Sequence, residues 1–307
     1  MIFPQCFSRY DHAGPRYTSY PTAVQFHDGV KPLDFLHAVD ASRAANRALS
    51  LYVHIPFCAN ICYYCGCNKV ITKDRSRARE YLACLEREME LVSAHLGPDQ
   101  LVEQLHFGGG TPTFLSHQEL GELMAALRRN FNLHDDDIAD YSIEIDPREA
   151  DWATMGLLRE LGFNRVSFGV QDLDPEVQRA VNRLQSLEQT QTVMDAARTL
   201  AYRSINIDLI YGLPKQTPER FARTVEAIIE LKPEFSAAEH VGGLPFKNET
   251  DREHHRVGLV GQSHADTDEI FQLGSAPVSQ EYALPAKAVK DFLPPAFGHL
   301  AKYEIGP

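Results

Sequence analysis

Four cysteines lie within ten residues of the chain, at Cys58, Cys62, Cys65 and Cys67, and only two others occur in all 307 residues. Zinc sites usually need two cysteine pairs a dozen or more residues apart, and no second pair is present. A Cys-x3-Cys-x2-Cys loop can instead supply three thiolates to one [4Fe–4S] cluster, which leaves one iron without a protein ligand. Because an open iron can bind a reactant, the spacing favours a catalytic iron–sulfur cluster over zinc or free thiols.

A glycine run, "GGGTP" at residues 108–112, is a second segment that could do chemistry. Glycines after a strand let a ligand approach the backbone closely and leave N–H and C=O groups open to it. A simple tight turn is the alternative interpretation. A Walker A phosphate loop is excluded, because no Gly-Lys-Ser/Thr follows the run. The segment is therefore a candidate for contact with a small cofactor.

The composition is that of a globular protein, with 44% hydrophobic and 23% charged residues, and the length predicts one or two domains. The net charge of -12 argues against a nucleic-acid partner, since phosphate binding needs a basic face. We find no run of eighteen apolar residues and no secretory pattern at the N-terminus, so we expect no membrane span. We therefore expect a cytoplasmic protein, in whose reducing surroundings clustered cysteines bind metal more often than they form disulfides.

The elements that position these segments alternate between short β-branched runs and amphipathic helical ones from residue 50 to 232. Repeated strand–helix units predict a parallel sheet with right-handed crossovers. Five units, with a sixth starting near Phe235, suit an α/β fold. Either a doubly wound sheet or a partial (β/α)6 barrel fits, and the near-regular spacing favours the barrel. Strands are predicted at 50–57, 102–107, 140–146, 164–172 and 204–212.

Local signals mark the ends of several helices. Ser116 lies three residues before Glu119, a capping-box pattern that predicts a helix start. Gly162 predicts a helix end, and Pro218 predicts another helix start. His54, inside the first predicted strand, is interpreted as a core residue. These signals support a helix in the crossovers between strands.

Polar residues gather at the carboxyl ends of the predicted strands. The cysteine cluster follows the first strand, and the glycine run follows the second. The next three strands end near acidic or amide side chains, namely Glu144, Asp146, Gln171, Asp172 and Asp208. In parallel α/β barrels, the carboxyl ends of the strands form the functional face. Five independent segments therefore direct polar groups to one mouth.

Cys-x3-Cys-x2-Cys is the signature of radical S-adenosylmethionine (SAM) enzymes, and further motifs narrow the resemblance. The chain contains, in this order, "YVHIPFC", "CGCNK", "FGGGTPTFL", "IEIDPRE", "GFNRVSFGVQD", "VQRAVNR" and "NIDLIYGLPKQT". Together they resemble the oxygen-independent coproporphyrinogen III oxidase (dehydrogenase) family, from about Gly14 to Pro233. A related haem-chaperone family typically lacks Cys67 and the N-terminal arm "GPRYTSYPTA" (14–23), and this chain has both.

The resemblance implies roles for individual residues. Cys58, Cys62 and Cys65 would ligate a [4Fe–4S] cluster, and Cys67 would be an additional cysteine of the family rather than a fourth ligand. Arg16 is a candidate to bind a substrate propionate, because a guanidinium can pair with a carboxylate through two hydrogen bonds. SAM, in one or two molecules, would contact Tyr52, Tyr64, Gly109, Gly110, Thr111, Glu144, Gln171, Arg183 and Asp208. No side chain is assigned as catalytic.

The resemblance also implies a reaction. In the family, an electron from the cluster cleaves SAM to methionine and a 5′-deoxyadenosyl radical, which removes a hydrogen from a substrate propionate. Loss of CO2 and a further electron leaves a vinyl group. Two rounds convert coproporphyrinogen III to protoporphyrinogen IX in haem synthesis. The implied partners are this substrate and an unidentified electron donor, and we expect a monomer.

The resemblance ends after Pro233, where the family continues with a further strand and a mostly helical domain that closes over the substrate. We predict an N-terminal arm or lid (1–49), a radical-SAM partial barrel (50–245) and an atypical tail (246–307) too short for that domain. Truncation, a change of reading frame or divergence could each produce the tail. Three interpretations stay open: an active dehydrogenase, a non-catalytic iron–sulfur or haem-binding relative, and a barrel fragment that does not fold stably.

Overall fold

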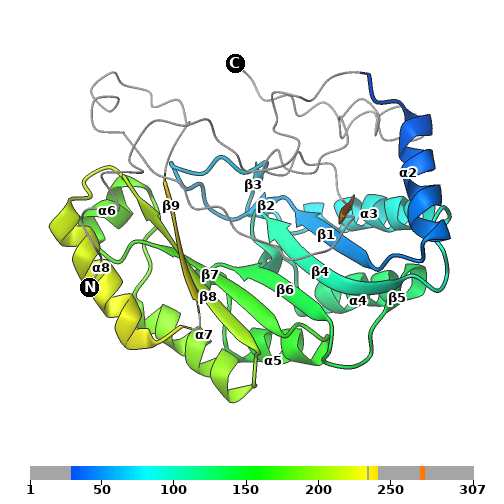
Figure 1. The fold of residues 1–307 in the computed structure, drawn as a ribbon. Helices are drawn as coiled ribbons and strands as arrows, with labels where there is room; N and C mark the ends of the chain where they lie inside the picture. Colours follow the sequence, from blue (N-terminus) through cyan, green and yellow to red (C-terminus); the bar gives the residue numbers. More distant parts are fainter. Residues whose placement is uncertain (1–28, 234, 241–269, 274–307) are drawn as a thin grey trace, which may run out of the picture.

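A curved parallel sheet forms the centre of the computed structural model, which describes residues 29–233, 235–240 and 270–273 (Figure 1). The strands lie in the order β10-β1-β4-β6-β7-β8-β9, every neighbouring pair is parallel, and the short β5 pairs with β4. Their bounds are β1 Leu49–Ile55, β4 Leu101–Gly109, β5 Asn132–Leu133, β6 Asp140–Ile145, β7 Arg165–Gln171, β8 Ser204–Tyr211, β9 Phe235–His240 and β10 Ile270–Leu273. The α/β partial barrel predicted from the sequence is confirmed, as are its five strands and the sixth near Phe235.

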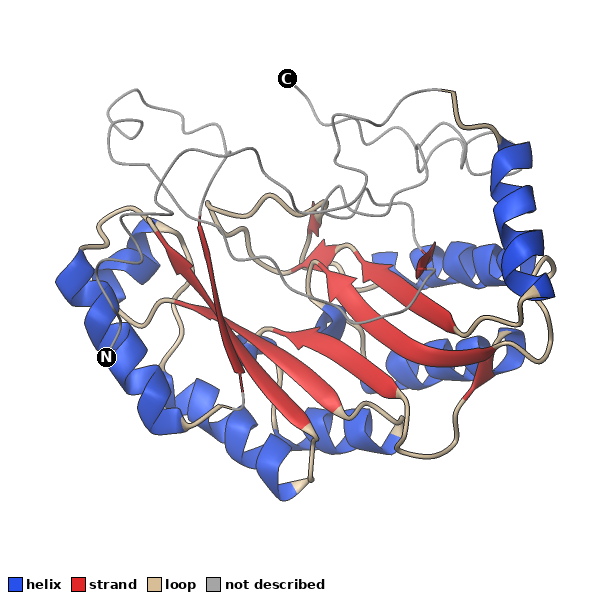
Figure 2. Ribbon diagram, viewed as in Figure 1, coloured by secondary structure: helices blue, strands red, loops and turns tan. Residues whose placement is uncertain are grey.

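Each crossover between consecutive strands of the barrel carries a helix, and these helices lie on one side of the sheet (Figure 2). The helices are α2 Pro32–Ala44, α3 Arg77–Ser93, α4 His117–Asn130, α5 Trp152–Glu160, α6 Pro175–Ala180, α7 Leu187–Thr199 and α8 Pro218–Leu231. Short elements shape the loops at the carboxyl ends of the strands: β2 Phe57–Cys58, β3 Val70–Ile71, and the 3-10 turns η2 Pro112–Phe114 and η3 Pro147–Glu149.

Alternate strand residues face opposite sides of the sheet, as the two-residue period of a strand requires. The residues on the helix side are apolar and fully buried, for example Leu105, Phe107, Ile143, Phe168 and Ile207. The residues between them are polar and only partly buried, for example His106, Ser142, Glu144, Ser167 and Asp208. The sheet therefore presents a polar inner surface that leads to the carboxyl ends of the strands.

The predicted helix ends are also found. The Ser116 side chain accepts a hydrogen bond from the backbone N–H of Glu119, and the Glu119 carboxylate accepts one from the backbone N–H of Ser116 at 2.9 Å. Gly162 follows the end of α5 with a φ of 108°, a left-handed conformation that glycine adopts without strain. Pro218 is the first residue of α8.

Removing the Ser116 cap tests the start of α4. In Ser116→Ala the Glu119 N–H loses its side-chain acceptor, so we expect the free energy of unfolding to fall by about 1 kcal/mol, measured by urea denaturation. Ser116→Asn keeps an acceptor and should stay within about 0.5 kcal/mol of the wild type. Equal losses in both variants would contradict the capping explanation.

Two elements lie outside the strands and helices predicted from the sequence. β10 lies in the segment 246–307 and pairs with β1, with Ser50 opposite Ile270. A four-residue strand in a polar segment gives too weak a periodic signal to be recognised from the sequence. α2 lies in the segment interpreted as an arm. Its buried Ser42 hydroxyl accepts a hydrogen bond from Gln100 at 3.3 Å, which fixes α2 against the α3–β4 connection.

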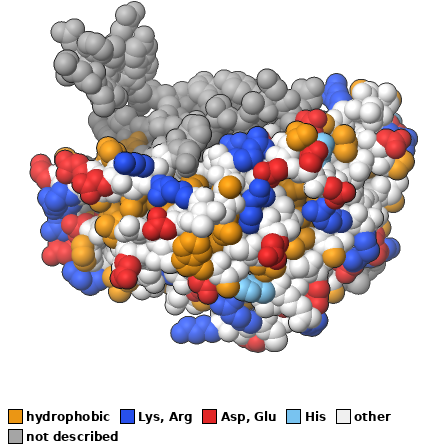
Figure 3. Space-filling view, turned by 90° about the horizontal axis from the view of Figure 1, so that it is seen from below, with side chains coloured by type: hydrophobic (Ala, Val, Ile, Leu, Met, Phe, Trp, Pro, Cys, Tyr) orange, Lys and Arg blue, Asp and Glu red, His pale blue; other side chains and the backbone are white. Residues whose placement is uncertain are grey.

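The lower surface carries charges of both signs. Seen from below, Lys and Arg side chains are interspersed with Asp and Glu side chains (Figure 3). This face therefore offers no broad basic field among its described residues. In the part of the chain that the structure describes, none of the helices combines the length and hydrophobicity needed to cross a bilayer.

Candidate cofactor site

A cavity at the carboxyl ends of the strands contains about 810 Å³ of empty space, part of it open to solvent. The cavity brings together candidate residues from six separate segments, namely Cys58, Cys62, Tyr64, Cys65, Cys67, Gly109, Gly110, Thr111, Glu144, Gln171, Arg183 and Asp208. It is also lined by Lys69, Asp146, Arg148, Glu149 and Ser167, to which the sequence assigns no cofactor contact.

The loop that carries the cysteines is closed at its base and tied to the barrel. β2 and β3 pair in parallel, and the backbone N–H of Thr72 donates to the Cys58 carbonyl at 2.9 Å. Farther along the loop, the Asn182 side chain donates to the Ile61 carbonyl at 2.7 Å. The Lys69 ammonium donates to the Cys65 carbonyl at 2.7 Å. These bonds hold the thiols at the cavity although the loop has little regular structure of its own.

The thiols have different surroundings. Burial raises the pKa of Cys58 to about 11, although the Thr111 hydroxyl, 3.5 Å from its sulfur, acts in the opposite direction. The Cys67 thiol donates to the Cys65 sulfur, which lowers the pKa of Cys65 to about 6 and raises that of Cys67.

The glycine run brings β4 close to the start of the cysteine loop. The backbone N–H groups of Gly110 and Thr111 donate to the carbonyls of Ile55 and Phe57, each at 2.8 Å. A Cβ on Gly110 would lie 2.7 Å from the Phe57 carbonyl oxygen, so a larger residue does not fit. Gly109 has a φ of 113°, a conformation that other residues rarely adopt. Glycine is therefore required by the backbone itself, beside any role in cofactor contact.

Glu144 is held toward the cavity from β6. Its carboxylate oxygens lie 3.3 Å from His106 Nε2 and accept from the backbone N–H of Gly109 at 3.3 Å. Burial favours the protonated carboxyl, but these hydrogen bonds outweigh it, so the pKa of Glu144 lies below its ordinary value. An ionised Glu144 can accept hydrogen bonds from an ammonium or from ribose hydroxyls.

Asp208 and Gln171 complete the opposite wall. Asp208 accepts from Ser167 of β7 at 2.5 Å and from Asn206 of its own strand, β8, at 2.7 Å, so two adjacent strands fix its carboxylate. The pairing of β7 with β8 shifts register between Gly169 and Gln171, and Gln171 has a φ of 71°. This irregularity belongs to the end of β7, where Gln171 lines the cavity.

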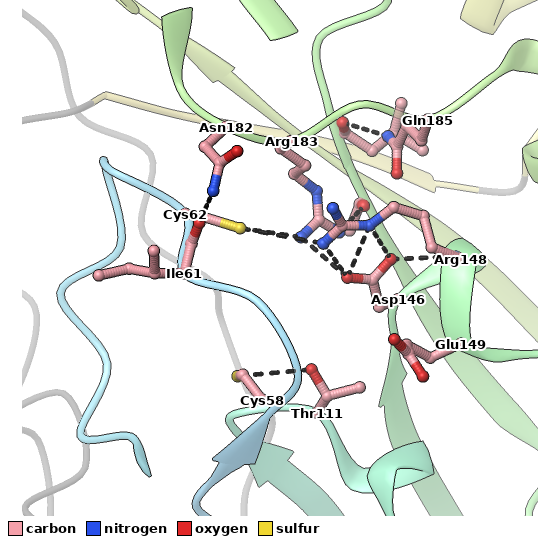
Figure 4. Close-up of polar contacts among 12 residues, drawn as sticks. Cys58, Ile61, Cys62, Thr111, Asp146, Arg148, Glu149, Asn182, Arg183 and Gln185 are labelled. Atoms are coloured by element: carbon pink, nitrogen blue, oxygen red, sulfur yellow. Dashed lines mark hydrogen bonds and ion pairs between the residues drawn. The ribbon is translucent and has the colours of Figure 1, made fainter. Parts of the chain in front are cut away.

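Two guanidinium groups share one carboxylate beside Cys62 (Figure 4). Asp146 accepts from Arg148 Nη2 at 2.6 Å and lies 3.1 Å from Arg183 Nη1. Despite burial, the two arginines hold the pKa of Asp146 below its ordinary value. Burial alone would lower the pKa of Arg183, but Tyr64, Asp146 and Cys62 raise it, so Arg183 keeps its charge.

The donor set fits a cluster and an anionic cofactor. The thiols of the cysteine loop, Arg148 and Arg183 line one shared cavity, so thiolate sulfur is available to a cluster and guanidinium groups are available to an anionic cofactor. Among the described residues, the buried Nε of Arg183 has no hydrogen-bond partner.

The remaining candidates have other positions. Tyr52 lies outside the residues that line the cavity and stacks on His106, with 5.6 Å between ring centroids. Its contact with a cofactor stays a prediction. His54 is buried, as expected of a core residue. Arg16 lies outside the described residues. Cys84 is half-buried on α3, away from the cavity lining.

His54 is expected to make stability depend on pH. The Asn68 carbonyl accepts from His54 Nε2 at 2.9 Å, so Nδ1 of the neutral ring accepts from the Tyr52 hydroxyl at 3.2 Å. Burial lowers the pKa of His54, and the bond to Asn68 offsets this only in part. Below pH ~6.5 the unfolded chain binds a proton on His54, whereas the folded chain keeps this ring neutral. The stability of the cluster-free protein therefore falls as pH falls, by up to about 1.4 kcal/mol per pH unit.

The measurement is urea denaturation of the cluster-free protein between pH 5 and 8 (~1 unit steps) for wild type and His54→Gln. Glutamine can still donate to the Asn68 carbonyl but does not titrate. A flatter stability profile is therefore expected for His54→Gln. The same pH dependence in both proteins would show that another group is responsible.

The sequence does not single out Arg148 or His106, although each contacts a candidate residue directly. Arg148 lies in the quoted motif "IEIDPRE", two residues beyond Asp146 at the end of a predicted strand. From that position, the Arg148 side chain could have been predicted to lie near the carboxyl ends of the strands. His106 gives no comparable signal, because its contact with Glu144 depends on the pairing of β4 with β6.

Comparison with known proteins agrees with this geometry. A family model described as the radical SAM superfamily matches residues 52–228. An oxygen-independent coproporphyrinogen III oxidase of Pseudomonas aeruginosa is 69% identical over 237 residues, which are 77% of this chain and 52% of that protein. A protein of the same description from Escherichia coli is 48% identical over 237 residues, 77% of this chain and 51% of that protein.

A solved structure, described as the coproporphyrinogen III oxidase of Escherichia coli and as a radical SAM enzyme, has a TM-score of 0.73 at 38% identity. The comparison covers 98% of this chain and 61% of that one. The chain spans about half the length of the curated relatives it matches.

Proposed function

Since this chain belongs to the radical SAM superfamily, we propose that it binds a [4Fe–4S] cluster and SAM and acts as an oxygen-independent coproporphyrinogen III dehydrogenase in haem synthesis. The substrate follows from the relatives that share its barrel at 48% to 69% identity. The observation that carries the proposal is the cavity itself. It places the cysteine loop, the glycine run and the polar ends of three further strands around one space.

Cys58, Cys62 and Cys65 would hold the cluster, and Cys67 is the additional cysteine beside them. When bound, the cluster and SAM supply a 5′-deoxyadenosyl radical that removes hydrogen from a substrate propionate. Within the chain, Arg183 offers its unpartnered Nε–H to the SAM carboxylate. Glu144 remains ionised to accept from the SAM ammonium or ribose.

The other candidate contacts have narrower roles. Gly109, Gly110 and Thr111 provide backbone close to the bound molecule, and Gln171 and Asp208 offer polar groups from the opposite wall. Tyr64 closes the cavity near Cys62, and Tyr52 supports the wall from behind. Residues 50–245 form the cofactor-binding barrel in this proposal, with 1–49 as an arm whose Arg16 binds a propionate, and 246–307 as a tail whose β10 pairs with β1.

The test is anaerobic reconstitution of the chain with iron and sulfide, followed by SAM, a reductant and coproporphyrinogen III. Deoxyadenosine and porphyrin products are assayed together. Protoporphyrinogen with deoxyadenosine supports the full proposal. Deoxyadenosine without porphyrin product shows a working radical site and rejects the substrate assignment for this chain. A stable cluster with neither product favours the non-catalytic iron–sulfur relative instead.

A further inference from the structure

Cys62 has a different electrostatic environment from the other two proposed ligands. Cys58 has a neutral neighbour, the Thr111 hydroxyl, at 3.5 Å. Cys65 accepts from another thiol and also has the Lys69 ammonium as a neighbour. Cys62 instead lies 3.5 Å from Arg183 Nη1 and 3.9 Å from Arg148 Nη2, so its sulfur contacts two guanidinium groups (Figure 4).

The network formed by Asp146, Arg148 and Arg183 carries a net charge of one positive unit. Asp146 is the one carboxylate paired with both arginines. Arg148 binds it through two parallel contacts, Nε to Oδ1 at 2.9 Å and Nη2 to Oδ2 at 2.6 Å. The three side chains are only 7% to 18% exposed, so water screens them weakly. Arg148 therefore neutralises Asp146 and leaves the charge of Arg183 uncompensated.

The backbone fixes this arrangement. Asp146 also accepts from the backbone N–H of Arg148 at 3.0 Å, in the turn that η3 forms directly after β6. The carboxylate is thus held by its own chain segment, and Arg183 reaches it from the segment after α6. Arg183 also donates to the Gly169 carbonyl, so it keeps a backbone contact when Arg148 or Asp146 is replaced.

A positive charge beside a cluster ligand favours the reduced cluster, because reduction adds one negative charge at that place. Charge and hydrogen bonds at the sulfur ligands are known determinants of iron–sulfur potentials. We infer that Arg148 is a positioning residue that keeps Asp146 neutralised, and thereby raises the reduction potential of the cluster at Cys62. This inference rests on the proposed function, and it gives Arg148 a role that neither the motifs nor the relatives assign.

The test is a redox titration of the reconstituted protein, followed by electron paramagnetic resonance of the reduced cluster, in the absence of SAM and substrate, so that no SAM carboxylate pairs with Arg183. In Arg148→Gln the net charge of the network falls to zero. At a fixed potential we expect the ratio of reduced to oxidised cluster to fall at least tenfold, which is about 59 mV for one electron.

The opposite variant separates charge from structure. Asp146→Asn raises the net charge of the network to two, so its potential should rise above that of the wild type. The double variant Arg148→Gln/Asp146→Asn restores one positive charge and should return toward the wild-type potential. If Arg148 and Asp146 merely supported the fold, both single substitutions would shift the reduction potential in the same direction. The double variant would then not return to the wild-type potential.

Arg159→Gln is the matched control, because Arg159 forms an ion pair with Asp137 at 2.8 Å and does not line the cavity. Its potential should equal that of the wild type. If Arg148→Gln assembles no cluster, the Asp146→Asn variant alone tests the inference, because a charge effect requires its reduction potential to rise above that of the wild type. The inference is overturned if the ratio of reduced to oxidised cluster changes less than twofold in the single variants, or if both variants shift the potential in the same direction. A wild type that assembles no cluster overturns the proposed function itself.

Discussion

Replacing Cys58, Cys62 or Cys65 with alanine is expected to abolish cluster assembly. Each variant leaves two thiolates where three are needed to hold a cubane with one open iron. Iron and sulfide should fall from about four of each per chain to near zero, together with the visible absorbance of the cluster and the formation of deoxyadenosine. Chemical iron and sulfide analysis after anaerobic reconstitution measures the effect.

Two further cysteines serve as controls for the loss of a thiol. Cys84→Ala removes a half-buried thiol on α3, away from the cavity, and should keep the full cluster. Cys67→Ala removes a cavity thiol that is assigned no ligand role, so it should also keep a cluster. A complete cluster in any of the three ligand variants would contradict the assignment. Loss of the cluster in Cys67→Ala would make Cys67 a ligand instead.

Gly110→Ala is expected to displace the cysteine loop from the barrel. The added Cβ would lie 2.7 Å from the Phe57 carbonyl oxygen and 2.8 Å from the Pro56 carbonyl carbon, and neither backbone atom can rotate away. Overpacking of this kind costs about 1–3 kcal/mol of stability. Because Cys58 follows Phe57 directly, a weaker or absent cluster should accompany the loss. Urea denaturation and iron analysis measure the two effects.

Gly121→Ala provides the matched control. Gly121 lies inside α4, and a Cβ there would meet no atom within 4 Å. Since alanine favours a helix over glycine by about 1 kcal/mol, this variant should be slightly more stable than the wild type and should hold a full cluster. Equal effects of the two substitutions would show that glycine content, rather than contact with the loop, explains the result.

The fold was largely predictable because its signals are local. Strand positions followed from β-branched runs, and the start of α4 followed from Ser116 and Glu119 three residues apart. The gathering of the cysteine loop, Glu144 and Asp208 at one mouth followed from a general property of parallel sheets, whose carboxyl ends share one edge. None of these predictions required knowledge of which side chains touch.

The missed features depend on contacts between distant segments. His106 meets Ser142 at 2.7 Å because β4 and β6 pair in one particular register, and no local pattern specifies a register between separate parallel strands. Asp146 and Arg148 are neighbours in sequence, but Arg183 joins them only through the turn after α6. The network beside Cys62 could therefore be recognised only in three dimensions.

The hydrogen bonds between the cysteine loop and the residues after α6 have a consequence for the synthesis of the protein. Asn182 donates to the carbonyl of Ile61 across 121 residues of sequence, and the Tyr63 N–H donates to the Val181 carbonyl. Translation proceeds at about 5–20 residues per second, so the thiols emerge on the order of ten seconds before their anchor exists. During that interval the cysteine loop lacks the hydrogen bonds that position it, and its thiols are free to react. Productive insertion of the cluster therefore belongs after synthesis of α6, and the nascent thiols need a reducing environment until then.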